Sequence, residues 1–362
     1  MHVHFIGEPD DGMSISSHHA RALADWGVEV SFDDGQTDPR RHARRADVIH
    51  VVIDAPTDAL LLRRLALLRL RGKAIVRYWS GRDVLWAKYD PASRVFARAL
   101  VRLGAVQLAR TPPLVEELAR IGVAAQAGPV VSVHLENTSL PEPLPATFTV
   151  LCSLPTARRE FCGGKWVDGL IRRLPQVRFL ILGDSAGDYS PFRNVESLGT
   201  TDDIARTIKR STVVLQPRMD GVLSRLSLEA LCHGRHVIAT HSTPHTQYAG
   251  SLEAFLASIR ALERDADFNL AGREYVCREY ALPQTARRLL GIIQDHADPQ
   301  SGGGRRGRWR TVLMALGGAA GLSRSSSAPP DPQFLPTEAA AFVALLEGSG
   351  GRVTDQPAEA MP

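Results

Sequence analysis

Short apolar runs alternate with stretches of helical period along most of the chain, and this alternation constrains the fold more than any other feature. Before residue 110 the apolar runs cover residues 3–7, 46–53, 73–78 and 105–109. They are rich in valine, isoleucine or leucine, as strands buried on both faces of a sheet are. Helical stretches such as LLLRRLALLRL separate them. The pattern predicts a parallel sheet with helices on both faces.

A second alternation begins after a proline-rich segment. Residues 128–147 (GPVVSVHLENTSLPEPLPAT) combine prolines and polar residues without a period, which is typical of a linker. Apolar runs return at residues 148–154, 177–183, 212–217 and 236–240. We therefore predict an α/β protein with two Rossmann-like doubly wound domains that face each other across a cleft. The first covers residues 1–145, and the second, with its closing helices, covers residues 146–297.

The composition changes abruptly at residue 298. Residues 298–362 contain SGGGRRGRW and SRSSSAPPDPQ, which lack a core-building pattern and predict a mostly disordered, low-complexity tail. Within it, residues 305–322 place four arginines and Trp309 beside an apolar stretch too short to span a bilayer. We favour a solvated tail, because two glycines weaken a helix there. Contact with an anionic membrane surface is the open alternative.

Charge and cysteine usage narrow the classes of partner and compartment. The 43 Lys and Arg against 39 Asp and Glu give a net charge of +4, so we expect no nucleic-acid partner. The four cysteines form no C-x-x-C pair, which favours a reducing compartment without disulfides or a zinc knuckle. The N-terminal residues lack a signal-peptide pattern. We expect a cytoplasmic protein, with peripheral contact at the inner membrane face as the alternative.

The loops that follow the strands of the first domain are the first places to search for a site. Ligands of doubly wound sheets bind beyond the carboxyl ends of the strands. Gly12 ends a glycine-containing loop that lets a ligand approach the backbone, although an ordinary turn explains it equally well. His18 lies at the start of the next helix and is a candidate to line the cleft. Asp83 either accepts hydrogen bonds from a hydroxylated ligand or caps the segment that follows it.

The second domain has a basic loop after its first strand. Residues 156–165 (TARREFCGGK) contain Arg158, Arg159 and Lys165, which can supply positive charge and bidentate donors to a diphosphate. Surface cations on a loop are more often simply solvated. Elsewhere, His241 and His245 have helical metal-ligand spacing, but Pro244 interrupts it and no third ligand is evident, so we predict no metal site.

Residues 216–234 (QPRMDGVLSRLSLEALCHG) are the most informative stretch of the chain. Ser224 is placed to cap a helix, which would turn the positive helix end toward the cleft and suit a phosphate or a sugar hydroxyl. Glu229 is an unusual carboxylate among apolar neighbours, and two vicinal ribose hydroxyls would provide it with partners.

The same stretch, LSLEALCHGRHVIAT, together with RFLILGD and the paired α/β pattern, resembles the nucleotide-sugar-dependent glycosyltransferases of the GT-B fold. It is similar to the family 4-like retaining group, whose E-A-x-x-x-G-x-x-V-I-A core matches Glu229 to Ala239. The family has another glutamate before this one, with seven residues between the two, and that position falls at Gly221, with Asp220 beside it. The resemblance implies catalytic roles for Asp220 and Glu229, with Glu229 on the ribose.

The resemblance also implies an activity. It predicts transfer of a hexose or related sugar from a nucleoside diphosphate to a hydroxyl acceptor, with retention and without a metal or other cofactor. Donor binding would involve Gly12, Arg158, Arg159, Lys165, Ser224 and Glu229, and the acceptor side would involve His18 and Asp83. We expect a nucleotide sugar and a carbohydrate or lipid-linked acceptor as partners, in surface polysaccharide or glycolipid synthesis. A sugar-nucleotide epimerase and a non-catalytic glycosyltransferase partner are the alternatives.

Overall fold

The computed structural model describes most of the chain in a series of segments. They are residues 1–7, 14–33, 43–53, 59–130, 143–156, 159–183, 189–201, 203–218, 220, 222–297 and 305–318. Gly12 and Arg158, both predicted to bind the donor, lie outside the described residues, as does Gly221.

The first domain is built on a six-stranded parallel sheet in the order β2-β1-β3-β4-β5-β6. Its central strands are buried along their whole length. Most of their side chains are apolar, and the polar ones, His2, His4, His50 and Arg77, are buried with them. The strands are β1 (His2–Ile6), β2 (Glu29–Phe32), β3 (Val48–Val52), β4 (Ala74–Trp79), β5 (Val106–Ala109) and β6 (Gln126–Ala127).

Helices cover both faces of this sheet, as the sequence predicts. The helices connecting the strands are α1 (Ile15–Ala24), α3 (Ala59–Leu70), α4 (Arg82–Tyr89), α5 (Pro91–Arg102) and α6 (Pro112–Arg120). Helix α1 contributes Leu23 to a core cluster with Val48 and Val76. On the other face α3 and α5 join a cluster around Ile49 and Ile75. Alternate side chains of each strand thus enter different cores.

The second domain has a six-stranded parallel sheet in the order β12-β11-β10-β7-β8-β9. Counted from β7, this is the 3-2-1-4-5-6 order of dinucleotide-binding domains, with its switch point between β7 and β10. The strands are β7 (Thr149–Ser153), β8 (Arg178–Leu182), β9 (Val195–Gly199), β10 (Val213–Gln216), β11 (His236–Ala239) and β12 (Gln247–Tyr248), and the helices are α7 (Gly164–Arg173), α8 (Ile204–Lys209), α9 (Arg225–Cys232), α10 (Leu252–Arg264) and α11 (Leu270–Glu279).

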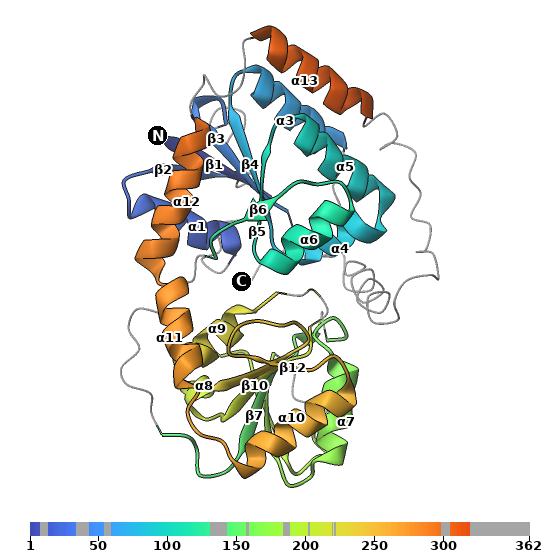
Figure 1. The fold of residues 1–362 in the computed structure, drawn as a ribbon, viewed down its shortest axis with the longest axis vertical. Coiled ribbons are helices and arrows are strands. Elements are labelled where there is room, and N and C mark those ends of the chain that lie inside the picture. The colour runs from blue at the N-terminus through green and yellow to red at the C-terminus, as the bar shows by residue number, and fades with distance from the viewer. Residues whose placement is uncertain are drawn as a thin grey trace, which may run out of the picture.

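The chain then returns to the first domain, which differs from the predicted organisation. Helix α12 (Leu282–Ala297) packs on α1 and contributes Leu289 and Ile293 to a first-domain core, although we assigned residues up to 297 to the second domain. Figure 1 shows α12 running along the side of the first domain. The helix buries its apolar side chains on the first sheet, so the closing helices belong to both domains.

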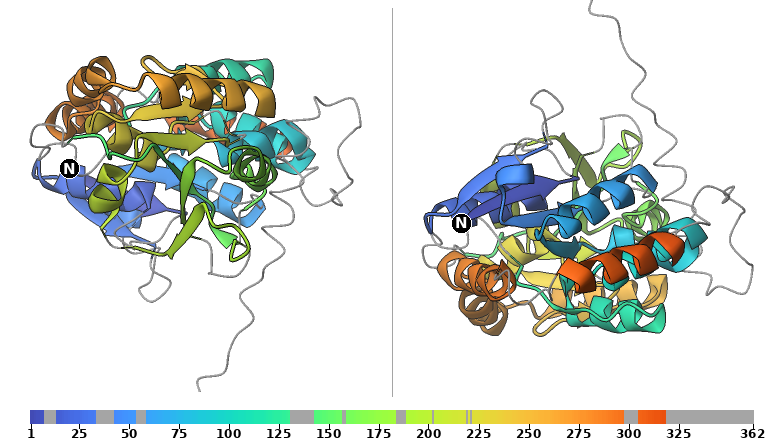
Figure 2. Two further views of the ribbon diagram at one scale, coloured as in Figure 1. Left: turned by 90° about the horizontal axis from the view of Figure 1, so that it is seen from below. Right: turned by 90° about the horizontal axis from the view of Figure 1, so that it is seen from above.

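Part of the predicted disordered tail is also a helix. Residues Arg305–Gly318 form α13, which packs against α3 and α5. Viewed from above, α13 lies across these two helices (Figure 2). Val312 and Ala315 are buried in the same core cluster as Leu65 of α3 and Leu100 of α5. The tail prediction is therefore wrong for residues 305–318, because tertiary packing outweighs the low helix propensity of the glycines.

Candidate functional site

A cavity of about 440 Å³ lies between the two domains. It is bounded by the carboxyl ends of strands from both sheets, which is where doubly wound folds bind ligands. Its lining includes Ile15, His18, His19, Tyr78 and Arg110 from the first domain and Ser153, Pro155, Phe161, Gln216, Arg218, Ser224 and Arg225 from the second. The cleft predicted from the sequence is thus present, and it contains side chains of both domains.

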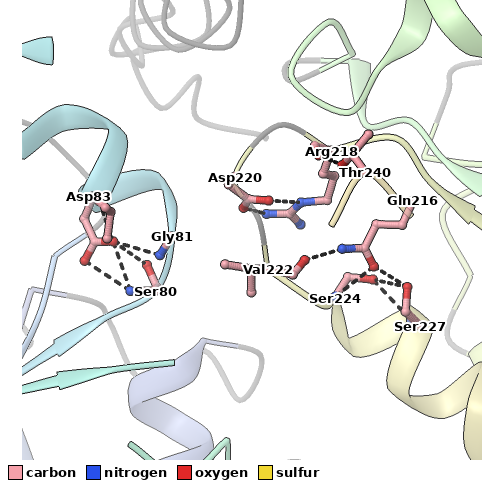
Figure 3. Close-up of polar contacts among 11 residues, drawn as sticks. Ser80, Gly81, Asp83, Gln216, Arg218, Asp220, Val222, Ser224, Ser227 and Thr240 are labelled. Carbon is pink, nitrogen blue, oxygen red and sulfur yellow. Dashed lines mark hydrogen bonds and ion pairs between the residues drawn. The ribbon is translucent and has the colours of Figure 1, made fainter. Parts of the chain in front are cut away.

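Helix α9 begins in the wall of this cavity. Ser224 is its N-cap, and the Ser224 Oγ accepts a hydrogen bond from the Ser227 backbone N–H at 3.1 Å. Gln216, at the end of β10, accepts from the Ser224 backbone N–H at 2.9 Å and from the Ser227 hydroxyl, and its amide donates to the Val222 carbonyl (Figure 3). This network fixes the loop against the helix. The positive end of the helix is therefore held at the cavity, where it favours an anion.

Arg218 and Asp220 form a close ion pair in the loop between β10 and α9. The Arg218 Nε donates to Asp220 Oδ1 at 3.1 Å, and a second guanidinium nitrogen donates to Oδ2 (Figure 3). The Asp220 side chain is 1% exposed, whereas Arg218 reaches the cavity over the Phe161 ring. The carboxylate thus orients the arginine and does not itself line the cavity in this structure.

Glu229 has a partner that the sequence analysis did not consider. Its Oε1 accepts a hydrogen bond from the Arg225 Nε at 2.6 Å, one helical turn earlier. Glu229 is buried, while Arg225 lines the cavity. The pair explains how a carboxylate is tolerated in an apolar helix, and it places Glu229 directly behind a cavity-lining cation.

Arg110 is the cation of the first domain that lines the cavity. It follows β5 directly, and its Nε is buried without a hydrogen-bond partner among the described residues. Burial lowers the pKa of Arg110, and the Arg218 guanidinium of the other domain lowers it further. An arginine stays protonated even so, because its ordinary pKa lies far above neutral pH. A buried guanidinium whose Nε has no hydrogen-bond partner among the described residues is costly unless an anion accompanies it.

A pair of buried histidines lies at the first-domain side of the cavity, and His19 is the one of the pair that lines it. His19 Nδ1 lies 3.3 Å from His50 Nε2, and the Tyr78 ring meets the His19 ring edge-on at a centroid distance of 4.6 Å. Burial lowers the pKa of His50 to about 3 and holds the pKa of His19 well below its ordinary value. His18, which the sequence predicts at the cleft, also lines the cavity. The neutral imidazole of His19 can donate or accept a hydrogen bond in the cavity without adding charge.

These histidines predict a pH-dependent stability. His241, buried beside Asp220 and Arg218, has a pKa lowered by burial to about 4. Unfolded, the imidazoles of His19, His50 and His241 take up protons below about pH 6.5, whereas the folded protein keeps them neutral. We expect the free energy of unfolding to be highest above pH 6.5 and to fall as the pH falls to 5, by up to about 1.4 kcal/mol per pH unit per histidine. Urea titrations across this range measure the slope, and His50→Gln should make it shallower. An unchanged slope in that variant would contradict the assignment.

Asp83 is a structural residue in this structure and does not line the cavity. Its carboxylate pairs with Arg77 at 2.6 Å. It also accepts from the backbone N–H groups of Ser80 and Gly81 at 3.0 and 2.9 Å (Figure 3). The geometry therefore gives Asp83 a structural role, although it holds the turn before α4 from within the first helical turn and the N-cap itself is Gly81. The turn that it holds contacts the other domain, because a Cβ on Gly81, whose φ is 127°, would lie 2.5 Å from the Val222 side chain.

The basic residues after β7 do not reach the cavity. The Arg159 guanidinium donates to Asp168 at 2.6 Å and to the Tyr189 hydroxyl at 2.7 Å, and neither Arg159 nor Lys165 lines the cavity. The Lys165 side chain is 85% exposed and lies 3.6 Å from Glu160. The structure thus brings Ser224 and His18 to the cavity, with Glu229 and Asp220 behind its arginines, and leaves Arg159, Lys165 and Asp83 outside it.

Four functional candidates at the cavity were not predicted from the sequence: Arg110, Arg218, Arg225 and His19. Each lies within two residues of the carboxyl end of a strand or in the first turns of a helix at the cavity. The rule that ligands bind at the carboxyl ends of strands could have identified Arg110, because it follows the predicted strand at residues 105–109. Among the described residues, no three His, Cys, Asp or Glu side chains are grouped as metal ligands.

The fold has relatives among solved structures. HepE of Anabaena, solved with UDP and glucose, matches with a TM-score of 0.62 and 12% identity over 82% of this chain and 100% of that chain. Sucrose-phosphate synthase of Thermosynechococcus elongatus matches with a TM-score of 0.64 and 14% identity over 82% of this chain and 98% of that chain. AviGT4, a glycosyltransferase involved in avilamycin A biosynthesis, matches with a TM-score of 0.53 and 11% identity over 82% of this chain and 98% of that chain. No known family model and no curated protein sequence matches the chain. These likenesses show the fold, which is the predicted GT-B arrangement.

Proposed function

We propose that this protein is a glycosyltransferase, which moves a hexose or related sugar from a nucleoside diphosphate to a hydroxyl group of a carbohydrate or lipid-linked acceptor. The observation that carries the proposal is the cationic cavity between the domains, where Arg110, Arg218, Arg225 and the start of α9 come together. A diphosphate has the complementary charge. HepE has been solved with UDP-glucose, so UDP-glucose is the first donor to test.

The positive groups would act on the leaving diphosphate. Negative charge grows on the diphosphate as its bond to the sugar breaks, so fixed cations stabilise the transition state more than the bound donor. Arg110 and Arg225 can reach the cavity from the two domains, and the start of α9 supplies backbone N–H groups. Asp220 acts as a positioning residue, because it holds the Arg218 guanidinium. These roles replace the ones that the sequence suggested for Arg159 and Lys165.

Three finer statements belong to the same proposal. Retention at the anomeric carbon is supported by the resemblance of residues 229–239 to the retaining family 4-like group. Independence from a metal is supported by the arginines, whose charge would serve the diphosphate directly. A role in surface polysaccharide or glycolipid synthesis follows from the same resemblance and awaits identification of the acceptor.

The experiment that tests the proposal has a binding step and a transfer step. UDP, GDP, ADP and their glucose conjugates are added to the full chain, and thermal unfolding is measured. A ligand at a hundred times its dissociation constant adds about 2.7 kcal/mol to the free energy of unfolding. The conjugate of the nucleotide that binds is then incubated with hydroxyl acceptors, and NMR reports the anomeric configuration of the product.

The outcomes separate the proposal from its alternatives. A glycosylated acceptor and free nucleoside diphosphate support it, and the retained configuration supports its stereochemistry. Interconversion of two sugar nucleotides without acceptor would favour the epimerase. Nucleotide binding without turnover, over an acceptor panel, would favour a non-catalytic partner. Failure of every nucleotide to bind would overturn the donor site itself.

Replacing Glu229 tests the ribose contact separately from the ion pair with Arg225. We expect Glu229→Ala to lower the affinity for UDP roughly 10- to 100-fold, since a hydrogen bond to a charged group contributes about 1.5–3 kcal/mol. The native protein should also bind UDP more tightly than its 2′-deoxy analogue, and the variant should lose this preference. Calorimetry with both ligands measures the four affinities. A variant that still discriminates would show that Glu229 acts only by anchoring Arg225, and Glu263→Ala on α10 is the control.

A further inference from the structure

Three neighbouring helices on the first domain concentrate positive charge. Helices α3, α5 and α13 pack against one another on the outer side of the first sheet (Figures 1 and 2). Their sequences contain ten arginines and neither aspartate nor glutamate. The whole chain, by contrast, balances 43 basic with 39 acidic residues. We call the outer surface of α3, α5 and α13 the basic helical face.

Exposed apolar side chains lie among these charges. Leu60 and Leu67 of α3 are 74% and 57% exposed, and Leu313 and Met314 of α13 are 64% and 50% exposed. They make up half of the eight large apolar side chains found exposed in the described part of the chain. Single exposed leucines are ordinary, but a group on two packed helices indicates a contact surface.

Some of the arginines on this face already have structural partners, and others extend into solvent. Arg64 pairs with Asp33 at 2.5 Å, and Arg69 and Arg98 donate to backbone carbonyls. Arg63 and Arg310, by contrast, are exposed. Arg71 and Arg102, at the ends of α3 and α5, are exposed as well. The exposed arginines are therefore placed to meet an anionic partner without disturbing the core.

We propose that the basic helical face docks on the surface of a bilayer that contains anionic lipids. Arginines would contact headgroup phosphates, and the leucines and methionine would enter the boundary between headgroups and acyl chains. A bilayer surface combines both chemistries, whereas nucleic-acid phosphates give exposed leucines no apolar environment. Among the described residues, no helix is long and apolar enough to cross a membrane, so the contact is peripheral.

Helix α13 packs on α3 and α5, and this packing decides which of its side chains can contact the bilayer. A free amphipathic tail would insert its own apolar residues, but Val312 and Ala315 of α13 are already buried against α3 and α5. The membrane-facing residues are instead Leu313 and Met314, together with Leu60 and Leu67 of α3. A folded surface composed of several helices therefore makes the contact. It lies at the far end of the first domain from the second domain (Figure 1).

Sedimentation of the full chain with lipid vesicles tests the proposal. Vesicles that mix phosphatidylcholine with anionic phosphatidylglycerol should bind the protein, because their surface potential attracts arginines. Vesicles of pure phosphatidylcholine should not bind it. The double variant Arg63→Ala/Arg310→Ala should bind about 30-fold more weakly, since each arginine near the surface contributes about 1 kcal/mol. Leu67→Ser/Leu313→Ser should also weaken binding, and added salt should reduce the effect of the arginines.

A matched control lies on the other domain. Arg260 and Arg264 are exposed on α10, and Arg260→Ala/Arg264→Ala should leave vesicle binding unchanged. Three results would overturn the proposal. The control could lose as much vesicle binding as the arginine variant, the protein could bind neutral vesicles as well as anionic ones, or both variants of the basic helical face could bind vesicles as the native protein does. Duplex DNA could instead displace the protein from vesicles, while Leu67→Ser/Leu313→Ser leaves vesicle binding unchanged. That result would assign the surface to nucleic acid. Thermal unfolding of each variant verifies that the fold is retained.

Discussion

Replacing Arg110 by alanine is expected to lower the affinity for a nucleoside diphosphate roughly 10- to 100-fold without destabilising the protein. A charge-assisted contact contributes about 1.5–3 kcal/mol to binding. In the absence of ligand, however, the Arg110 Nε is buried without a hydrogen-bond partner among the described residues. Burying such a cation costs free energy. The unliganded variant should therefore be as stable as the native protein or more so.

Opposite changes in affinity and stability distinguish a ligand contact from a structural role. Calorimetry measures the affinity for UDP, and urea unfolding without ligand measures the stability. Arg110→Lys keeps the positive charge but loses the planar guanidinium group with its paired donors. Its affinity for UDP should therefore lie between those of the native protein and Arg110→Ala. Arg102→Ala, an exposed position of the same domain, is the control. Unchanged UDP affinity in Arg110→Ala, or a clear loss of stability, would show that the cavity does not use Arg110 for the diphosphate.

The fold was largely predictable because its signal is local. Strand β3, with the sequence VIHVV, is buried at every position. Such a short, mostly apolar run predicts a buried parallel strand from its own sequence alone. Ser224 likewise caps α9 as predicted, because a serine before an apolar helical stretch satisfies a backbone N–H of the first turn. The domain to which α12 belongs was not predictable in this way. That choice depends on which sheet offers a matching apolar surface.

The site was only partly predictable because it depends on pairings between distant segments. Arg159 and Lys165 have the charge for a diphosphate, but Asp168 and Tyr189 bind the first, and the second points to solvent. Arg110 follows a predicted strand, but only the fold shows that it lines the same cavity as Arg218 of the other domain. The Arg225–Glu229 pair is an exception, since its i, i+4 spacing is visible in the sequence.

The tail shows a further limit of local reasoning. Glycines within residues 305–318 lower the intrinsic helix propensity, and a helix of this length is marginal alone. The compensating signal lies in another segment. Helix α3 has leucines around its whole circumference, and one sheet face cannot bury all of them. Helix α13 covers part of that surface, which is why it is ordered.

Truncation after Ala297 is accordingly expected to destabilise the first domain, contrary to the expectation from sequence alone. Removing α13 takes away the buried side chains of Val312 and Ala315 and uncovers the apolar side chains of α3 and α5 that they cover. Burial of a valine side chain alone contributes about 1.5–3 kcal/mol, so we expect a total loss of about 3 kcal/mol. Urea unfolding of the two chains measures the difference, and a chain ending at Gly318, which retains α13, is the length control.

Point variants of α13 separate burial from mere chain length. Val312 is 2% exposed and Leu313 is 64% exposed, although they are adjacent on the same helix. Val312→Ala should cost about 1–2 kcal/mol of the free energy of unfolding, through lost burial and the small cavity that it leaves. Leu313→Ala should change stability by less than about 0.5 kcal/mol. Equal effects of the two variants, or a truncated chain as stable as the full one, would mean that α13 does not pack on α3 and α5 in solution. The basic helical face would then lose one of its three helices, and vesicle binding by the truncated chain would reveal whether α3 and α5 suffice.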